Sequence, residues 1–116
     1  MARYEHLAIY RTAHELSSVV IDYVANFPRP FKPTLGLRLQ QLSVKIAMRV
    51  SKANSAQDKV PHLDRLLERK QELEYLLRIC EEKRFISRPQ YARAIELTSS
   101  VGKQANGWRR YASPAT

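Results

Sequence analysis

Four cations spaced along one predicted helix are the residues of this sequence best suited to binding chemistry. At about 100° per residue, Arg38, Lys45, Arg49 and Lys52 fall within a narrow arc of a helix. Residues 23–57 contain six cations and no acidic residue, whereas a solvated helix face usually interleaves Glu. Guanidinium and ammonium groups arranged in this way neutralise phosphates. The stripe therefore predicts contacts to a phosphate backbone without readout of bases.

A second group of cations lies in and around the last predicted helix. From residue 83 to the end there are seven cations and a single acid, Glu96. We expect a second basic surface here, made of Lys83, Arg84, Arg88, Arg109 and Arg110. The alternative for both groups is a solvated face with no partner, because charge runs often serve only to solvate a surface.

The composition of the whole chain agrees with a polyanionic partner. The 116 residues include 20 Lys plus Arg against 11 Asp plus Glu, which gives a formal charge of +9. Such an excess favours RNA or DNA first and an anionic membrane second. The stripe is not opposed by the bulky aromatic face of membrane-surface helices, so we expect no membrane partner. The sequence has no apolar run long enough to span a bilayer and no signal peptide, which predicts a cytoplasmic location.

The sequence contains no catalytic or metal-binding constellation. His6, His14 and His62 have no cysteine or acidic cluster at metal-ligand spacing around them. Cys80 is the only cysteine, which excludes an internal disulfide and a multi-cysteine metal cluster, and its place in an apolar stripe predicts a small core residue. We expect neither enzymatic activity, nor a cofactor, nor a metal site.

The elements that must position these residues are helices, because apolar residues recur at alternating spacings of three and four between proline-rich breaks. Four helices are expected, over residues 3–27, 34–54, 59–84 and 88–112. Thr34 and Asp58 are candidate N-caps, and Ser87 with Gln90 has capping-box spacing. A three-helix alternative would fuse the last two helices through residues 85–89, where a residue before proline disfavours the α region.

These helices predict an all-α fold, in which residues 1–116 form a single antiparallel up-down-up-down four-helix bundle. The expected interior consists of Leu16, Val20, Leu39, Leu42, Ile46, Leu73, Leu77, Val101 and Trp108. Lys70 falls in the apolar seam of the third helix, and we expect it to snorkel to the bundle edge. Gly102 either permits close helix approach or marks a frayed end.

A second apolar stripe on the first helix has two interpretations. Its members are Leu7, Tyr10, His14, Ser17 and Ile21. It is either part of a broad face toward the core or a contact between subunits, which would suit a bundle too small to bury much surface.

Several short strings resemble a known family of small four-helix-bundle proteins. They are Tyr4-Glu5-His6-Leu7 with Ile9-Tyr10, Phe27-Pro28-Arg29, and Val101-Gly102-Lys103-Gln104 with Gly107-Trp108. The family includes proteins encoded in intervening sequences of bacterial 23S ribosomal RNA genes. It also includes Avd, the accessory variability proteins of diversity-generating retroelements.

The resemblance implies a homopentameric barrel of bundles with a basic surface. Members of the Avd type bind the retroelement reverse transcriptase and its RNA, support mutagenic copying of that RNA into cDNA, and have no catalytic residues. The resemblance also implies a basic residue at Arg78 on the third helix, although Glu74, Glu81 and Glu82 make this face less cationic. High positive charge favours the Avd type. The alternative is a structural or interaction protein of the intervening-sequence type without a retroelement role.

Overall fold

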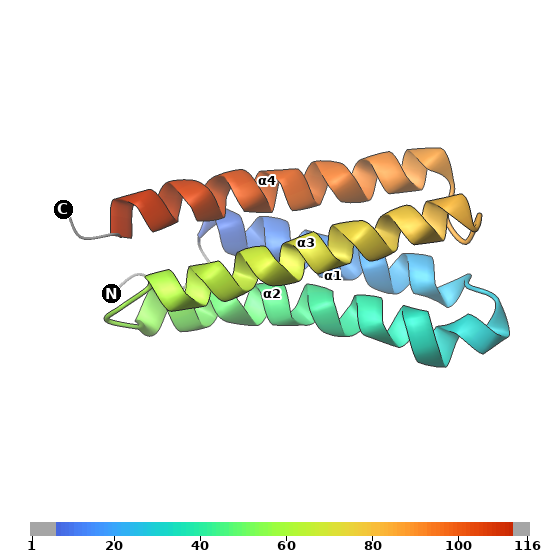
Figure 1. The fold of residues 1–116 in the computed structure, drawn as a ribbon, viewed down its shortest axis with the longest axis horizontal. Coiled ribbons are helices and arrows are strands. Elements are labelled where there is room, and N and C mark those ends of the chain that lie inside the picture. The colour runs from blue at the N-terminus through green and yellow to red at the C-terminus, as the bar shows by residue number, and fades with distance from the viewer. Residues whose placement is uncertain (1–6, 113–116) are drawn as a thin grey trace.

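The structure is a computed structural model that describes residues 7–112 (Figure 1). Its α-helices are α1 (Ala8–Ala25), α2 (Leu37–Ser55), α3 (Val60–Glu82) and α4 (Arg88–Ala112). Two short helical turns, η2 (Arg29–Phe31) and η3 (Lys32–Gly36), join α1 to α2. The described part of the chain contains no strand, which confirms the all-α prediction. The expected start of the first helix near residue 3 lies outside the described residues.

The four helices lie side by side along the long axis of the molecule (Figure 1). Each helix packs against the next one in the chain, and α4 also packs against α1. The α1–α2 and α3–α4 connections lie at one end of the molecule, and the α2–α3 connection lies at the other. Because α3 ends at Glu82 and a turn separates it from Arg88, the three-helix alternative is wrong.

The apolar stripes of all four helices meet in one core. Eight of the nine residues predicted to be inside are at most 1% exposed, including Leu42 and Ile46 at 0%. Trp108 is the exception, because it is only partly buried. It lies near the end of α4, where Leu7, Ala8 and Ile9 of the start of α1 are its neighbours. The helix end gives the indole fewer neighbours than a central position would.

The entry into α2 differs from the expected cap at Thr34. Helical turns already begin at Arg29, and the Thr34 hydroxyl donates to the Pro30 carbonyl over 3.2 Å instead of capping a helix. The wider turn of η3 places Gly36 against α1, where an added Cβ would lie 2.6 Å from Val24 Cγ1. Glycine is therefore required by close approach, and the helical path runs past the position that cap chemistry favours.

The other predicted helix starts follow the expected chemistry. Asp58 Oδ1 accepts the Val60 backbone N–H over 3.3 Å, although Lys59 is the residue at the N-cap. At the start of α4, the Ser87 backbone N–H donates to Gln90 Oε1 over 2.8 Å, and the Gln90 N–H donates to Ser87 Oγ over 3.2 Å. This reciprocal pair is the predicted capping box.

Lys70 makes an internal ion pair. Its ammonium lies 2.9 Å from Glu74 Oε1, and the other oxygen of Glu74 accepts the hydroxyl of the buried Thr98 over 2.7 Å. The Lys70 stem crosses Gly102, where an added Cβ would lie 3.0 Å from Lys70 Cε. Gly102 thus permits close approach of α3 to α4, and the lysine reaches a carboxylate rather than open solvent.

Candidate nucleic-acid interface

A small hollow lined by positive side chains lies between α2 and α3. Its volume is about 260 Å³. We call it the cationic groove, and its lining residues are Lys45, Met48, Arg49 and Lys52 of α2 with Arg69 of α3. Ile46 and Val50 of α2 are fully buried, so the core fixes the helix that carries three of the four cations. Three of the four cations of the predicted stripe are therefore brought together on a helix that the core holds in place.

The cations of this groove are not neutralised by neighbours. Within residues 7–112, no carboxylate forms an ion pair with Lys45, Lys52 or Arg69. Arg49 Nη1 lies 3.2 Å from His62 Nδ1, and arginine can only donate, so the imidazole accepts with its proton on the other nitrogen. This bond orients the Arg49 guanidinium and leaves its charge uncompensated. Four uncompensated cations in one hollow are chemically suited to contact phosphate oxygens.

Arg38 differs from the other three members of the predicted stripe. Its guanidinium contacts Glu72 Oε2 of α3 at 2.6 Å from Nη2 and 2.8 Å from Nε. The sequence pattern assigned all four cations the same role. In the described part of the chain, the packing of α3 on α2 gives Arg38 alone a carboxylate partner. An acidic residue on a different helix neutralises one end of the stripe.

Arg69 is a groove residue that the sequence pattern did not single out. Helix α3 carries mixed charges, so no run of cations marks Arg69. Two cross-helix pairs, Arg38 with Glu72 and Arg49 with His62, show how α2 and α3 are aligned. This alignment places Arg69 between the two pairs, on the wall opposite Lys45. Only the helix register could reveal it.

The second predicted basic surface is not one surface. Arg88 begins α4 and Arg109 lies 21 residues later, which is about 30 Å along a helix. Lys83 and Arg84 lie in the exposed α3–α4 turn, at the end of the molecule opposite to Arg109 (Figure 1). The predicted basic surface therefore consists of two separate groups of cations, one at each end of α4.

Acidic partners neutralise several of the predicted cations on α3 and α4 as well. Arg88 lies 3.5 Å from Glu81, and Arg78 lies 3.6 Å from Glu82. Arg109 Nε donates to Asp64 Oδ1 over 2.5 Å, and this hydrogen bond lowers the pKa of Asp64 and raises the pKa of Arg109. Lys83, Arg84 and Arg110 are exposed cations for which no ion pair is found within the described range.

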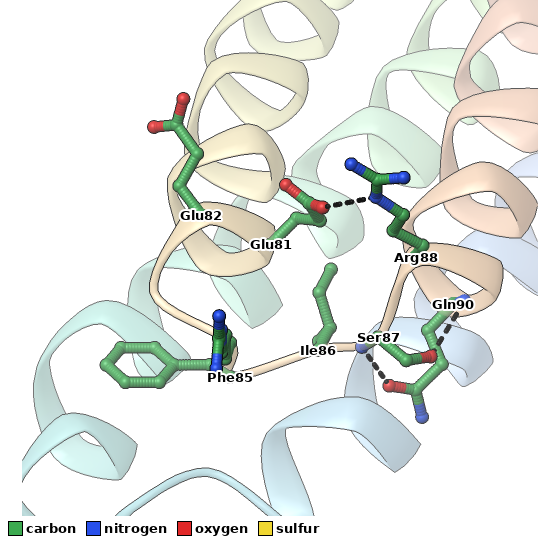
Figure 2. Close-up of a pocket in the computed structure, with 8 residues that line it drawn as sticks. Glu81, Glu82, Phe85, Ile86, Ser87, Arg88 and Gln90 are labelled. Carbon is green, nitrogen blue, oxygen red and sulfur yellow. Dashed lines mark hydrogen bonds and ion pairs between the residues drawn. The ribbon is translucent and has the colours of Figure 1, made fainter.

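A larger hollow opens beside the α3–α4 turn (Figure 2). We call it the turn hollow. Its volume is about 800 Å³, and its lining residues are Glu81, Glu82, Arg84, Phe85, Ile86, Ser87, Arg88 and Gln90. Figure 2 shows Glu81 paired with Arg88 across the hollow and the capping box at its lower edge. Arg84 has a φ of 63°, which places it in the left-handed region that ends α3. Of the two carboxylates here, Glu81 pairs with Arg88, and Glu82 pairs with Arg78 on its own helix.

A third, apolar groove separates α1 from α2. Its volume is about 320 Å³, and its lining residues are Tyr10, His14, Ser17, Ile21, Val44, Ala47, Met48 and Ser51. Ile21, Val44 and Met48 are 49%, 46% and 53% exposed, which is unusual for apolar side chains next to one another. The second stripe predicted on the first helix contributes four of these residues. We call this feature the apolar groove, and it borders the cationic groove at Met48.

Cys80 and the histidines are the remaining residues that the sequence analysis considered for catalysis or metal binding. No group of three or more His, Cys, Asp or Glu within residues 7–112 could hold a metal ion. Cys80 is fully buried, and burial raises the pKa of its thiol to about 11. His14 stacks on Tyr10 with ring centroids 6.1 Å apart. Among α1–α4, none combines the length and the apolarity that crossing a bilayer requires.

Comparison with known proteins places the chain in a family. No curated protein sequence matches it significantly. A family model described as bAvd-like matches residues 7–112, which is nearly the whole chain and includes all four helices and both sides of the cationic groove. The match agrees with the Avd resemblance of the short strings in the first and last helices. The chain therefore belongs to the bAvd-like family, the accessory variability proteins.

Proposed function

We propose that this chain is a non-enzymatic accessory protein of a diversity-generating retroelement, which holds RNA or DNA on its cationic groove. In this role it binds the reverse transcriptase together with the template RNA and supports mutagenic cDNA synthesis in the cytoplasm. It needs no cofactor or metal. The observation that carries the proposal is the set of four uncompensated cations in one hollow of a bAvd-like protein.

Phosphate contacts are expected to dominate the binding. The groove contains no aromatic side chain on which a base could stack, and Met48 is its only apolar lining residue. Binding should therefore tolerate any sequence, and specificity should come from the polymerase or from the shape of the RNA. If the cationic groove is not the interface, the candidates for phosphate contact become the exposed Lys83, Arg84 and Arg110, together with Arg38, Arg78, Arg88 and Arg109 once their carboxylate partners are displaced.

Self-association completes the proposal. We expect an antiparallel up-down-up-down bundle that assembles into a homopentameric barrel, with the apolar groove buried between subunits. Three half-exposed apolar side chains in a groove support this interface. Repeating one weak cationic groove around a ring raises avidity for a long polyanion without any new type of contact.

A second candidate function is an interaction protein of the 23S rRNA intervening-sequence type that binds no nucleic acid. It is favoured by the ion pairs of Arg38, Arg78, Arg88 and Arg109, which remove charge from four of the ten candidate cations. The apolar groove would serve this function equally well.

Binding of a labelled, unstructured RNA between about 50 and 200 mM salt separates the two functions. The first function predicts a log–log salt slope of about −3 per engaged protomer, since each of four phosphates contributes about −0.7. A matched RNA of different sequence should bind equally well. Absence of measurable binding at the lowest salt would overturn the nucleic-acid function and leave the interaction protein.

A further inference from the structure

The cationic groove is bounded differently at its two ends. Toward the α1–α2 connection, the next stripe cation is Arg38, which is held by Glu72 at 2.6 Å. Toward the α2–α3 connection, the next cation is Lys59, whose ammonium donates to the carbonyls of Ala53, Asn54 and Ala56 over 2.9–3.2 Å. Both flanking cations are therefore engaged within the protein, and the free positive charge lies between them.

Helix α2 alone does not account for the free charge. Arg69 approaches from α3 and lines the same hollow as Lys45, Arg49 and Lys52. Glu72 follows Arg69 on α3 within one helical turn, yet its carboxylate contacts Arg38 on α2. The pairing of Glu72 with Arg38 leaves the Arg69 guanidinium without an acidic partner among the described residues.

We propose that a nucleic-acid backbone crosses from α2 to α3 at Arg69, which contacts a phosphate, and that Glu72 ends this path by neutralising Arg38. This inference rests on the proposed function and deepens it by naming the route. The path differs from a straight course along α2, which would engage Arg38 instead of Arg69. It also limits the contact to a short stretch of backbone.

The length of the groove fits such a short contact. Lys45 and Lys52 are seven residues apart, which is about 10 Å along a helix. One strand of a duplex carries about three phosphates over that distance. Arg69 on the opposite wall adds a contact that is displaced sideways, so the bound backbone lies across the two helices.

The first test replaces Arg69 by Gln and measures binding of the same labelled RNA. We expect an affinity loss of about 5-fold and a salt slope that is flatter by about 0.7 per engaged protomer, because one phosphate contact is lost. Arg69→Lys, which keeps the charge, should retain the slope of the parent. Lys103→Gln on α4 removes the same charge from an exposed position away from the groove and should change neither quantity measurably. Equal losses for Arg69→Gln and Lys103→Gln would overturn the proposed contact.

The second test removes the acidic boundary. Glu72→Gln frees the charge of Arg38 and should tighten RNA binding by about 5-fold, with a slope steeper by about 0.7. The double variant Arg38→Gln/Glu72→Gln removes both charges of the neutral pair and should bind RNA as the parent does. Weaker binding of this double variant, or no gain from Glu72→Gln, would contradict the path. Circular dichroism of each variant excludes loss of helix as the cause.

The two proposals fail in different ways. When Lys45→Glu/Arg49→Glu binds RNA as the parent does, the groove is not the interface, and both the proposed function of this face and the path are overturned. When that double variant loses binding while Arg69→Gln does not, the groove function stands and only the crossing to α3 is overturned.

Discussion

Both the cationic groove and the turn hollow are lined by arginines, but they differ in the acidic residues that accompany them. The groove collects four cations from two helices, and no carboxylate lines it. The turn hollow is about three times larger, but two carboxylates line it, and Glu81 pairs with Arg88 across it (Figure 2). The charge available to a phosphate thus depends on ion pairing within the fold, and cavity size does not predict it.

Both regions depend on one core, and the largest expected effect is its disruption. Leu42 is fully buried beneath the groove helix, so Leu42→Ala should lower the free energy of unfolding by about 2–5 kcal/mol through lost transfer energy and a cavity. Chemical denaturation followed by circular dichroism measures this. A loss below about 1 kcal/mol would mean that α2 is not held by the core as described.

Self-association would distinguish the two regions, because the cationic groove borders the apolar groove and the turn hollow does not. Ile21→Glu places a charge in the apolar groove and should shift a pentamer toward the monomer, since burying an unpaired carboxylate between subunits is costly. Light scattering measures the mass. Tyr75→Glu is the matched control, because Tyr75 is 65% exposed on α3 and lies outside this groove. A parent protein that is already monomeric at micromolar concentration would remove the proposed assembly.

A substitution in the capping box tests whether the α3–α4 turn contributes to stability, to RNA binding or to both. Ser87→Ala removes the hydroxyl that accepts the Gln90 N–H and should cost about 0.5–2 kcal/mol of stability. RNA affinity should stay unchanged, because the box lies at the α3–α4 turn rather than at the groove. An accompanying loss of RNA binding would show that the turn takes part in the interface.

The smallest effect concerns the buried thiol. Burial raises the pKa of Cys80 to about 11 from 9.0, so the folded state retains its proton where the unfolded state loses it. The stabilising contribution is complete below pH 9.0 and is lost as the pH rises toward 11. Cys80 should therefore resist alkylation at pH 8 until the protein unfolds. Fast alkylation of the native protein would contradict its burial.

Sequence periodicity predicted the helices and core well, because each stripe depends only on local spacing. Eight of the nine named core residues are buried, and the Ser87–Gln90 box forms as its spacing predicts. The exceptions lie at helix ends. Thr34 does not cap α2, since the turns of η3 bring Gly36 against Val24 and the helical path begins earlier. Trp108 is only partly buried near the end of α4.

The candidate interface was only partly predictable for a different reason. Lys45, Arg49 and Lys52 share one helix, so their spacing alone placed them together. Arg38 was predicted as a contact and Arg69 was not. In the fold, α3 pairs Glu72 with Arg38 and leaves Arg69 as an uncompensated cation in the groove. The five cations named for the second basic surface appeared as one group in the sequence, but the length of α4 separates them. Such relations need the register between helices.

The salt dependence of RNA binding in two matched charge reversals tests the central claim most directly. Lys45→Glu/Arg49→Glu alters the cationic groove, and Lys83→Glu/Arg84→Glu alters the exposed turn by the same change in charge. We expect the first to weaken binding of all RNA sequences alike and to flatten the salt slope by about 1 or more, while the second stays close to the parent. Equal effects of the two variants would contradict the account, because binding would then follow net charge and not the groove.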